Sequence, residues 1–368
     1  MTDAGPSPHL TDPWRGFDGH ERVVVAQDPA TGTAMLIALH STVLGPALGG
    51  TRMNAYATAA DPGAAAYADV LRLSKAMTYK NALAGLDHGG GKAVIVRDPL
   101  QPNAKSPEVL HAYGRLVASL GGAYVTAGDV GISVSDMDVI GEACQWTTGR
   151  SVERGGVGDS GILTAVGVFE GMRAGVAFVF GSDSLEGRTV GVIGAGKVGG
   201  RLIEHLTAAG AMVTAADPSA EARARVEAHS PSVRWADSVD ELLVEDLDVV
   251  SPNALGGLLT PEVAARISTR LICGGANNQL SGPVAATLLA ERGIVYAPDF
   301  MVNCGGVIQV AEELRGGDLA RARADTERVY GTTLRVLERA AADGIAPVAA
   351  AEREAEDRIS RARAEQVV

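Results

Sequence analysis

The stretch RTVGVIGAGKVGGRLIEHLTAAGAMVTAADPSAEA, residues 188–222, decides the fold of the second half of this 368-residue chain. An apolar run, TVGVI, leads into Gly194, Gly196 and Gly199, which stand at G-x-G-x-x-G spacing where a helical pattern begins. A second apolar run follows and ends at Asp217. A strand, a glycine turn, a helix and a second strand form the first half of a dinucleotide-binding unit.

The glycine turn predicts where a dinucleotide would bind. The first glycine permits the tight turn, the second lets the backbone approach the pyrophosphate, and the third allows helix and strand to pack closely. The helix start adds free N–H groups and a partial positive charge. We therefore expect Gly194, Gly196, Lys197, Val198 and Gly199 to contact the cofactor, although the glycine spacing alone is equally compatible with tight packing.

Asp217 stands about twenty residues beyond the turn, where a carboxylate accepts hydrogen bonds from the adenosine ribose hydroxyls. The same charge would repel a 2′-phosphate, and Pro218 and Ser219 follow it rather than an arginine. NAD is therefore expected in preference to NADP. The alternative interpretation of Asp217 is a solvated turn residue at a strand end.

The remaining pattern predicts an α/β fold of two domains with a cleft between them. Apolar runs at 247–252, 270–276 and 293–299 alternate with helical stretches, as a doubly wound parallel sheet of the Rossmann type requires. Upstream, residues 21–40 predict a β-hairpin, 43–53 a glycine-rich loop, 65–85 a helix, and 106–122 a helix with Ser106 as N-cap and Pro107 as first residue. A polar, glycine-rich passage at 146–161 is the expected hinge. We assign 1–147 to a substrate-binding, catalytic and oligomerisation domain, 148–335 to the NAD-binding domain, and 336–368 to C-terminal helices that pack back on the first domain.

Composition narrows the class of partner. Hydrophobic residues make up 46% and charged residues 21%, as in a soluble globular protein. The net charge of −12 argues against nucleic acid or an anionic membrane as a partner and favours a small-molecule ligand. The first twenty residues do not resemble a signal peptide, and no apolar run approaches the length of a membrane span. Cys144, Cys273 and Cys304 lack metal-ligand spacing, so no metal site and a reducing cytoplasm are expected.

A second glycine-rich stretch, NALAGLDHGGGKAVI at 81–95, ends three consecutive glycines on Lys92. It is not a phosphate loop, because Leu86 and Ala93 occupy the positions that need a glycine and a serine or threonine. We expect the glycines to clear space beside Lys92 and to let the backbone turn sharply into the strand AVIV. Lys80 and Lys92 are flanked by apolar or small residues. If one cleft held both, each would depress the pKa of the other, and burial would lower it further and produce an amine able to act as a base. Surface lysines remain the alternative.

Several segments, in order, resemble the glutamate, leucine, phenylalanine and valine dehydrogenases: GPALGGTRM, AMTYKNALAGLDHGGGKAVI, VTAGDVG, GAGKVG, ANNQL and APDFMVNCGGVIQV. The resemblance runs from about residue 20 to the C-terminal helices and implies NAD-dependent oxidative deamination of an L-amino acid to a 2-oxo acid and ammonia. By position, it implies that Lys80 binds the substrate carboxylate, that Lys92 is the catalytic lysine, and that Asp129 assists proton transfer. It further implies that Gly49 and Gly50 wall the substrate site, that Asn277 contacts substrate and nicotinamide ribose, and that Thr164, Asn253 and Ala276 lie at the cofactor. A homo-oligomer is expected from the family alone.

The same resemblance bears on the substrate. Glutamate-specific members carry a lysine and a serine where this chain has Leu48 and Val310, so a glutamate side chain would be buried without a partner at a cost of several kcal/mol. Leu48, Ala127, Val307 and Val310 are expected to line an apolar pocket that favours valine and also admits leucine and isoleucine. Core packing is the alternative for Val307 and Val310. A phenylalanine or leucine dehydrogenase remains an alternative activity, and a catalytically silent regulatory protein that binds NAD and an amino acid is the alternative of another class.

Overall fold

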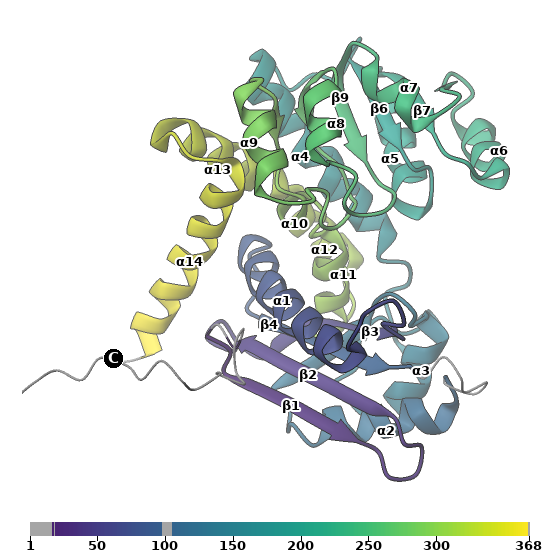
Figure 1. Cartoon of the computed structure of the whole chain (residues 1–368), viewed down its shortest axis with the longest axis vertical. Coiled ribbons are helices and arrows are strands. Elements are labelled where there is room, and N and C mark those ends of the chain that lie inside the picture. The colour runs from purple at the N-terminus through teal and green to yellow at the C-terminus, as the bar shows by residue number, and fades with distance from the viewer. Residues whose placement is uncertain (1–16, 18, 98–104, 367–368) are drawn as a thin grey trace, which may run out of the picture.

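The structure is a computed structural model that describes Phe17, residues 19–97 and residues 105–366. It has two bodies, one stacked above the other in Figure 1, and each is built around its own β-sheet. The two-domain α/β fold expected from the sequence is thereby confirmed.

The first body contains a five-stranded mixed sheet of order β1-β2-β4-β3-β5. β1 (Arg22–Gln27) and β2 (Ala34–Ser41) form the predicted hairpin, and β2 runs antiparallel to β4 (Gly89–Val96). β3 (Ala47–Asn54) lies parallel between β4 and β5 (Tyr124–Gly128). Helix α1 (Pro62–Leu83) packs on the face of the sheet that contains Val94, whereas α2 (Pro107–Ala118) and α3 (Val134–Ala143) pack on the face that contains Ile95. Ser106 and Pro107 open α2 as predicted.

Two glycine segments of this sheet differ from the prediction. Residues 47–54 form the strand β3, between β4 and β5, rather than a loop, and Gly89–Gly91 lie inside β4 rather than in a turn before it. Glycine weakens a strand, so its presence there marks a close approach of other atoms. A Cβ on Gly90 would lie 2.0 Å from the backbone nitrogen of Thr78 in α1, and one on Gly91 would lie 2.7 Å from the Tyr124 ring. The glycines therefore let α1 and β5 pack against the strand that holds Lys92.

The second body contains a six-stranded parallel sheet of order β11-β10-β9-β6-β7-β8. This is the order of a doubly wound dinucleotide-binding fold. The predicted strands are confirmed. The strands and the helices around them are β6 (Thr189–Ile193), α5 (Lys197–Ala208), β7 (Met212–Ala216), α6 (Ala220–His229), β8 (Arg234–Trp235), α7 (Val239–Val244), β9 (Leu247–Pro252), α8 (Pro261–Arg266), β10 (Thr269–Ile272), α9 (Pro283–Glu291) and β11 (Val295–Tyr296).

Helix α4 (Gly161–Phe180) enters the second body and corrects one expectation about the sequence. It is the single helix of the described residues that is long and apolar enough to cross a membrane, so the expectation that no run approaches this length is wrong. The helix packs against α5, α11 and α13, and Val168, Met172 and Val176 are fully buried in the main core of the second body. Its hydrophobicity is that of a core helix.

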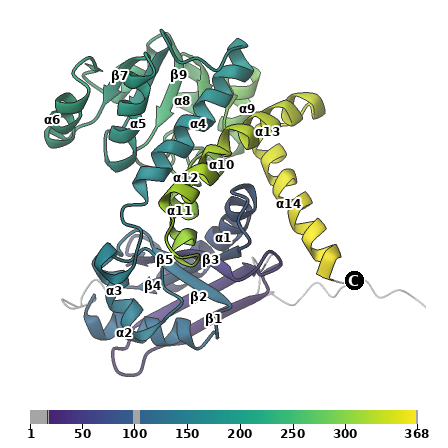
Figure 2. The ribbon, with the colours of Figure 1, turned by 180° about the vertical axis from the view of Figure 1, so that it is seen from behind.

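The chain after β11 connects the two bodies, as the view from behind shows (Figure 2). It forms α10 (Asp299–Val302), α11 (Gly305–Glu313), α12 (Leu319–Glu327), α13 (Val329–Asp343) and α14 (Pro347–Gln366). The Glu313 carboxylate at the end of α11 accepts hydrogen bonds from the backbone nitrogens of Gly149 (2.9 Å) and Val157 (3.1 Å), on either side of the short helix η1 (Val152–Arg154). In α14, Arg358 donates to the carbonyl oxygen of Ala82, in the last turn of α1, at 2.8 Å.

Candidate functional site

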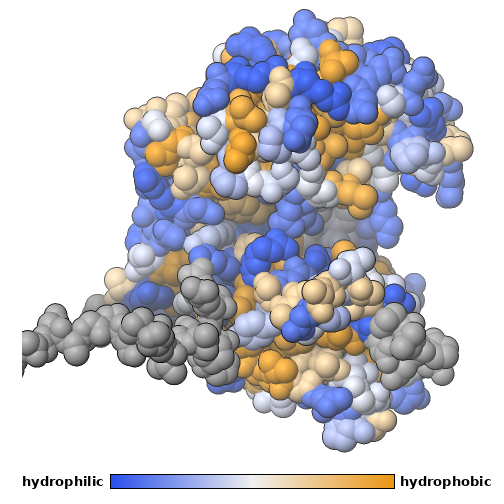
Figure 3. Space-filling view, in the orientation of Figure 1, coloured by the Kyte–Doolittle hydropathy of each residue, from blue (hydrophilic) through white to orange (hydrophobic). Residues whose placement is uncertain are grey.

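A cleft lies between the two bodies, and the space-filling view shows the recess between them (Figure 3). Residues of both bodies line it. The expected site residues that line this one cleft are Leu48, Gly49, Gly50, Lys80, Lys92, Ala127, Asp129, Thr164, Lys197, Val198, Asn277, Val307 and Val310.

Lys92 and Asp129 form an ion pair on the floor of the cleft. Lys92 projects from β4, Asp129 follows the last residue of β5, and the Nζ–Oδ2 distance is 2.7 Å. Only 6% of Lys92 is exposed. Burial alone would raise the pKa of Asp129, but the positive charges of Lys92 and Arg52 outweigh it and hold that pKa below its usual value. Asp129 is therefore a carboxylate at neutral pH and can accept a proton.

Lys80 lies in the last turn of α1 and faces the second body. Its Nζ donates to Asn277 Oδ1 at 3.3 Å, and the same oxygen accepts a hydrogen bond from Asn303 Nδ2 at 2.8 Å. Burial lowers the pKa of Lys80, with the nearby charge of Lys92 acting in the same direction and that of Asp299 opposing it. Both causes were expected from the sequence, and burial is the larger of the two at Lys80.

The backbone of β3 at Gly49 and Gly50 packs closely against the residues around it. A Cβ on Gly49 would lie 1.7 Å from the Gly91 carbonyl oxygen, and one on Gly50 would lie 2.9 Å from Cβ of Asp129. No side chain fits at either position without displacing the neighbouring strand. Tyr124 also holds this segment in place, because its hydroxyl donates a hydrogen bond to the Gly49 carbonyl oxygen at 2.7 Å.

An apolar wall closes one end of the cleft. Leu48 of β3 and Val307 of α11 belong to one buried cluster, and Val310 and Met77 pack against it partly buried. Ala127 of β5 is buried and also lines the cleft. Val307 and Val310 thus fit both interpretations, core packing and pocket lining, because these side chains pack in a core cluster and also border the cleft.

The glycine turn of the second body fits a dinucleotide. Gly194 has φ +92°, which favours glycine, and a Cβ on Gly199 would lie 1.9 Å from the Gly194 carbonyl oxygen. A Cβ on Gly196 would meet no atom within 4 Å, so the backbone is open to an approaching ligand. Gly196 is also the N-cap of α5 and supplies no side-chain cap, which leaves the N–H groups of the helix start for an anion.

Asp217 stands beside this turn at the end of β7, outside the cleft lining. Its Oδ2 accepts from the Ala195 backbone nitrogen at 2.6 Å and its Oδ1 from the Ser219 nitrogen at 2.8 Å. Arg223, for which the sequence predicted no role, donates from Nε to the Asp217 carbonyl oxygen at 2.8 Å. The Asp217 carboxylate therefore stabilises the glycine turn, in addition to any contact that it makes with a ligand.

Of the other expected cofactor residues, Asn253 and Ala276 follow the strands β9 and β10, and Thr164 lies in α4. Asn253 follows β9, and its Oδ1 accepts from the Gly275 nitrogen at 2.9 Å. The Ala276 nitrogen donates to the Pro252 carbonyl oxygen at 3.0 Å. Thr164, in the first turn of α4, donates from Oγ1 to the Ser160 carbonyl oxygen at 2.9 Å. Asn253 and Ala276 thus stabilise the loops after β9 and β10 without lining the cleft, whereas Thr164 lines it.

The cleft also holds polar residues that sequence reasoning missed. Arg52, Asp299 and Asn303 line it, and burial raises the pKa of Asp299. Each lies within a segment already quoted, yet none received a role. The available signal was strand periodicity, since Leu48, Gly50 and Arg52 alternate along β3 and share one face. Among the described residues, no group of three or more His, Cys, Asp or Glu side chains is placed to hold a metal ion.

Comparison with known proteins gives two family matches that cover most of the chain. Residues 20–146 match the model described as Glu/Leu/Phe/Val dehydrogenase, dimerisation domain, and residues 219–366 match Glutamate/Leucine/Phenylalanine/Valine dehydrogenase. Residues 170–264 also match the NAD binding domain of D-isomer specific 2-hydroxyacid dehydrogenases.

Individual relatives agree with these matches. The chain is 54% identical to a valine dehydrogenase of Streptomyces albus, over 94% of each chain. It is 43% identical to a leucine dehydrogenase of Bacillus subtilis, over 94% of this chain and 92% of that one. The solved structure of L-tryptophan dehydrogenase from Nostoc punctiforme superposes with a TM-score of 0.81 at 35% identity, over 95% of this chain and 98% of that one.

Proposed function

Because the chain belongs to the glutamate, leucine, phenylalanine and valine dehydrogenase family, we propose that it catalyses NAD-dependent oxidative deamination of a branched-chain L-amino acid. The products are the 2-oxo acid and ammonia, and the reaction is reversible. Valine is the favoured substrate, and leucine and isoleucine also react.

One observation carries this proposal: Lys80, Lys92 and Asp129 share a cleft with an apolar wall and with the start of a dinucleotide-binding helix. The choice of valine is supported by the valine dehydrogenases of Streptomyces, which are 54% identical to this chain. One methylene in an apolar pocket changes discrimination by only about 1–3 kcal/mol, so the preference among aliphatic side chains is modest.

The cofactor site follows from the geometry of the turn. Gly194, Gly196, Lys197, Val198 and Gly199 would hold the pyrophosphate, and Asp217 the adenosine ribose. Thr164, Asn253, Ala276 and Asn277 would surround the nicotinamide end. NAD, when bound, accepts the hydride that leaves the substrate Cα.

The residues of the first body bind and orient the substrate. The Lys80 ammonium binds the substrate carboxylate, which fixes Cα relative to the second body. Leu48, Ala127, Val307 and Val310 receive the aliphatic side chain. Lys92 activates the water that attacks the iminium carbon, and its ion pair with Asp129 gives the released proton an acceptor 2.7 Å away. Closure of the cleft keeps bulk water from the hydride step.

Purified protein, NAD and single L-amino acids at alkaline pH test the proposal through the absorbance of NADH. We expect the highest kcat/KM with L-valine, smaller values with L-leucine and L-isoleucine, and none with L-glutamate. Faster turnover of L-phenylalanine or L-leucine would support the alternative dehydrogenase activities. Binding of NAD without turnover of any amino acid would support the silent regulatory protein.

Three further statements belong to the proposal. The first body is the oligomerisation domain of a homo-oligomer, in line with its match to a dimerisation domain, and the protein acts in the cytoplasm. For the division at 1–147, 148–335 and 336–368, the first boundary is supported by the separation of the two sheets, and the contact of Arg358 with Ala82 supports the return of α14 to the first body. The last boundary falls inside α13, whose Val336 and Ala340 pack in the main core of the second body.

A further inference from the structure

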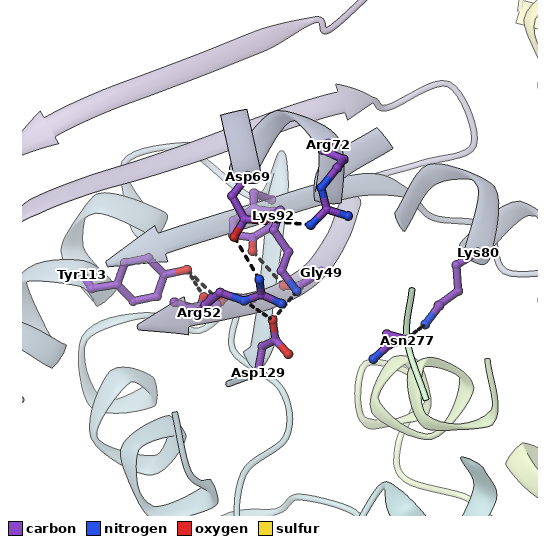
Figure 4. A network of polar contacts seen from close by, with 12 residues as sticks. Gly49, Arg52, Asp69, Arg72, Lys80, Lys92, Tyr113, Asp129 and Asn277 are labelled. Atoms are coloured by element: carbon purple, nitrogen blue, oxygen red, sulfur yellow. Dashed lines mark hydrogen bonds and ion pairs between the residues drawn. The ribbon is translucent and has the colours of Figure 1, made fainter. Parts of the chain in front are cut away.

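Asp129 has a second cationic partner besides Lys92. Nε of Arg52, on β3, lies 3.3 Å from Oδ2 of Asp129, the same oxygen that Lys92 contacts at 2.7 Å (Figure 4). Both side chains are mostly buried, with 21% of Arg52 and 22% of Asp129 exposed. Two charge-assisted contacts on one oxygen fix the rotation of a carboxylate more tightly than one contact does.

Arg52 is itself held from its other side. Its Nη1 lies 2.9 Å from Oδ2 of Asp69 in α1, so the guanidinium bridges two carboxylates through two different edges. A lysine ammonium at the end of a flexible stem cannot present two edges in this way. Asp69 in turn accepts a hydrogen bond from the Tyr56 hydroxyl at 2.8 Å and pairs with Arg72 at 2.9 Å.

We infer that Arg52 is a positioning residue for the proposed reaction: it holds Oδ2 of Asp129 against Lys92, while Asp69 holds Arg52. The inference rests on the proposed function, because Lys92 and Asp129 are its proton-transfer pair. Arg52 has no contact with reacting atoms in this role and acts through Asp129.

The charges around Asp129 determine the sign of the effect. Lys92 faces it from β4 and Arg52 from β3, while Lys80 and Asp69 of α1 and Tyr56 of the loop before α1 complete the charged and titratable surroundings. A cation beside a proton-transfer pair favours the deprotonated form of that pair. Loss of Arg52 therefore moves the acid limb of the pH–rate profile to higher pH, whereas loss of the negative charge of Asp69 moves it to lower pH.

Four variants test the inference through kcat/KM for L-valine from pH 6 to 11. For Arg52→Gln we expect a loss of about 10- to 100-fold, the scale of a displaced catalytic group, together with an acid limb at higher pH. Arg52→Lys keeps the charge, so its limb should lie closer to that of the wild type, although the bridge is lost. Asp69→Asn should shift the limb the other way. Arg72→Gln removes a partner of Asp69 that does not contact Asp129 and serves as the matched control.

An unshifted limb in Arg52→Gln would overturn the inference, even if activity falls, because a purely structural role predicts lower activity at every pH. Equal shifts in Arg52→Gln and Arg72→Gln would overturn it as well. A second measurement is independent of turnover: the carboxyl ¹³C signal of Asp129, assigned by its loss in Asp129→Asn, should titrate at higher pH in Arg52→Gln than in the wild type. A wild-type protein without turnover would count against the proposed function alone, and this titration would still decide the role of Arg52.

Discussion

Replacement of Asp217 tests whether its carboxylate selects the cofactor or only holds the glycine turn. A hydrogen bond to a charged group contributes about 1.5–3 kcal/mol. Because 1.4 kcal/mol corresponds to a factor of ten, Asp217→Ser should weaken NAD binding by about 10- to 150-fold. Removal of the charge also ends the repulsion of a 2′-phosphate, and the Arg223 guanidinium already lies against the Asp217 backbone at 2.8 Å. We therefore expect the ratio of kcat/KM with NADP to that with NAD to rise at least about tenfold.

Asp217→Asn separates the two roles of the carboxylate. The amide oxygen can still accept from the Ala195 nitrogen, which Asp217 contacts at 2.6 Å, so the turn keeps its support while the charge is lost. Steady-state kinetics with both cofactors and thermal unfolding of both variants give the two readouts. If the asparagine and serine variants keep the wild-type preference for NAD and differ only in thermal stability, then the carboxylate serves the turn and the assignment to the ribose is wrong.

Three other changes have defined outcomes. Lys92→Ala should abolish turnover of L-valine while NAD still binds, as measured by NADH absorbance and by fluorescence titration; retained turnover would remove Lys92 from the proposed mechanism. Gly90→Ala would place a Cβ 2.0 Å from the Thr78 nitrogen. Overpacking of this kind costs about 1–3 kcal/mol, so the melting temperature of this variant should fall. The control Gly331→Ala lies on α13, where the nearest atom is the Arg335 side chain at 3.6 Å, and should leave the melting temperature unchanged or raise it. Leu48→Lys combined with Val310→Ser should lower kcat/KM for L-valine and confer activity on L-glutamate, and a double variant that gains none would show that other residues reject the longer acid.

The second body could be predicted well from the sequence because its signals are local. The apolar run 189–193, the three glycines and Asp217 fall within thirty residues, and each has a separate steric or electrostatic reason. The hairpin of β1 and β2 and the start of α2 at Ser106 and Pro107 depend likewise on short-range chemistry. Elements of this kind can be predicted because the residues that determine them lie close together in the sequence.

The first body was harder to predict because its glycines are required by contacts with residues far away in the sequence. Gly49 and Gly91 are far apart in the chain, yet a Cβ on the first would strike the carbonyl oxygen of the second. The glycine content of residues 43–53 indicated a loop, which concealed the strand β3 and with it the alternation that places Arg52 beside Asp129. Asp69, seventeen residues further along, joins the site only through the packing of α1 on the sheet.

The contacts across the cleft show how Asn277 can keep a hydrogen-bond partner while a substrate binds. In this structure Lys80 Nζ donates to Oδ1 of Asn277, and Lys80 is the group proposed to bind the substrate carboxylate. When Lys80 turns to that carboxylate, Oδ1 of Asn277 keeps the hydrogen bond from Asn303 at 2.8 Å, so this oxygen does not lose its last partner. The same bond from Asn303 fixes the orientation of the Asn277 amide, which leaves its NH₂ group for the contacts that we propose with the substrate and the ribose. Asn303→Ala should therefore raise KM for the amino acid and for NAD together, whereas a change in one alone would show that Asn303 does not act through Asn277.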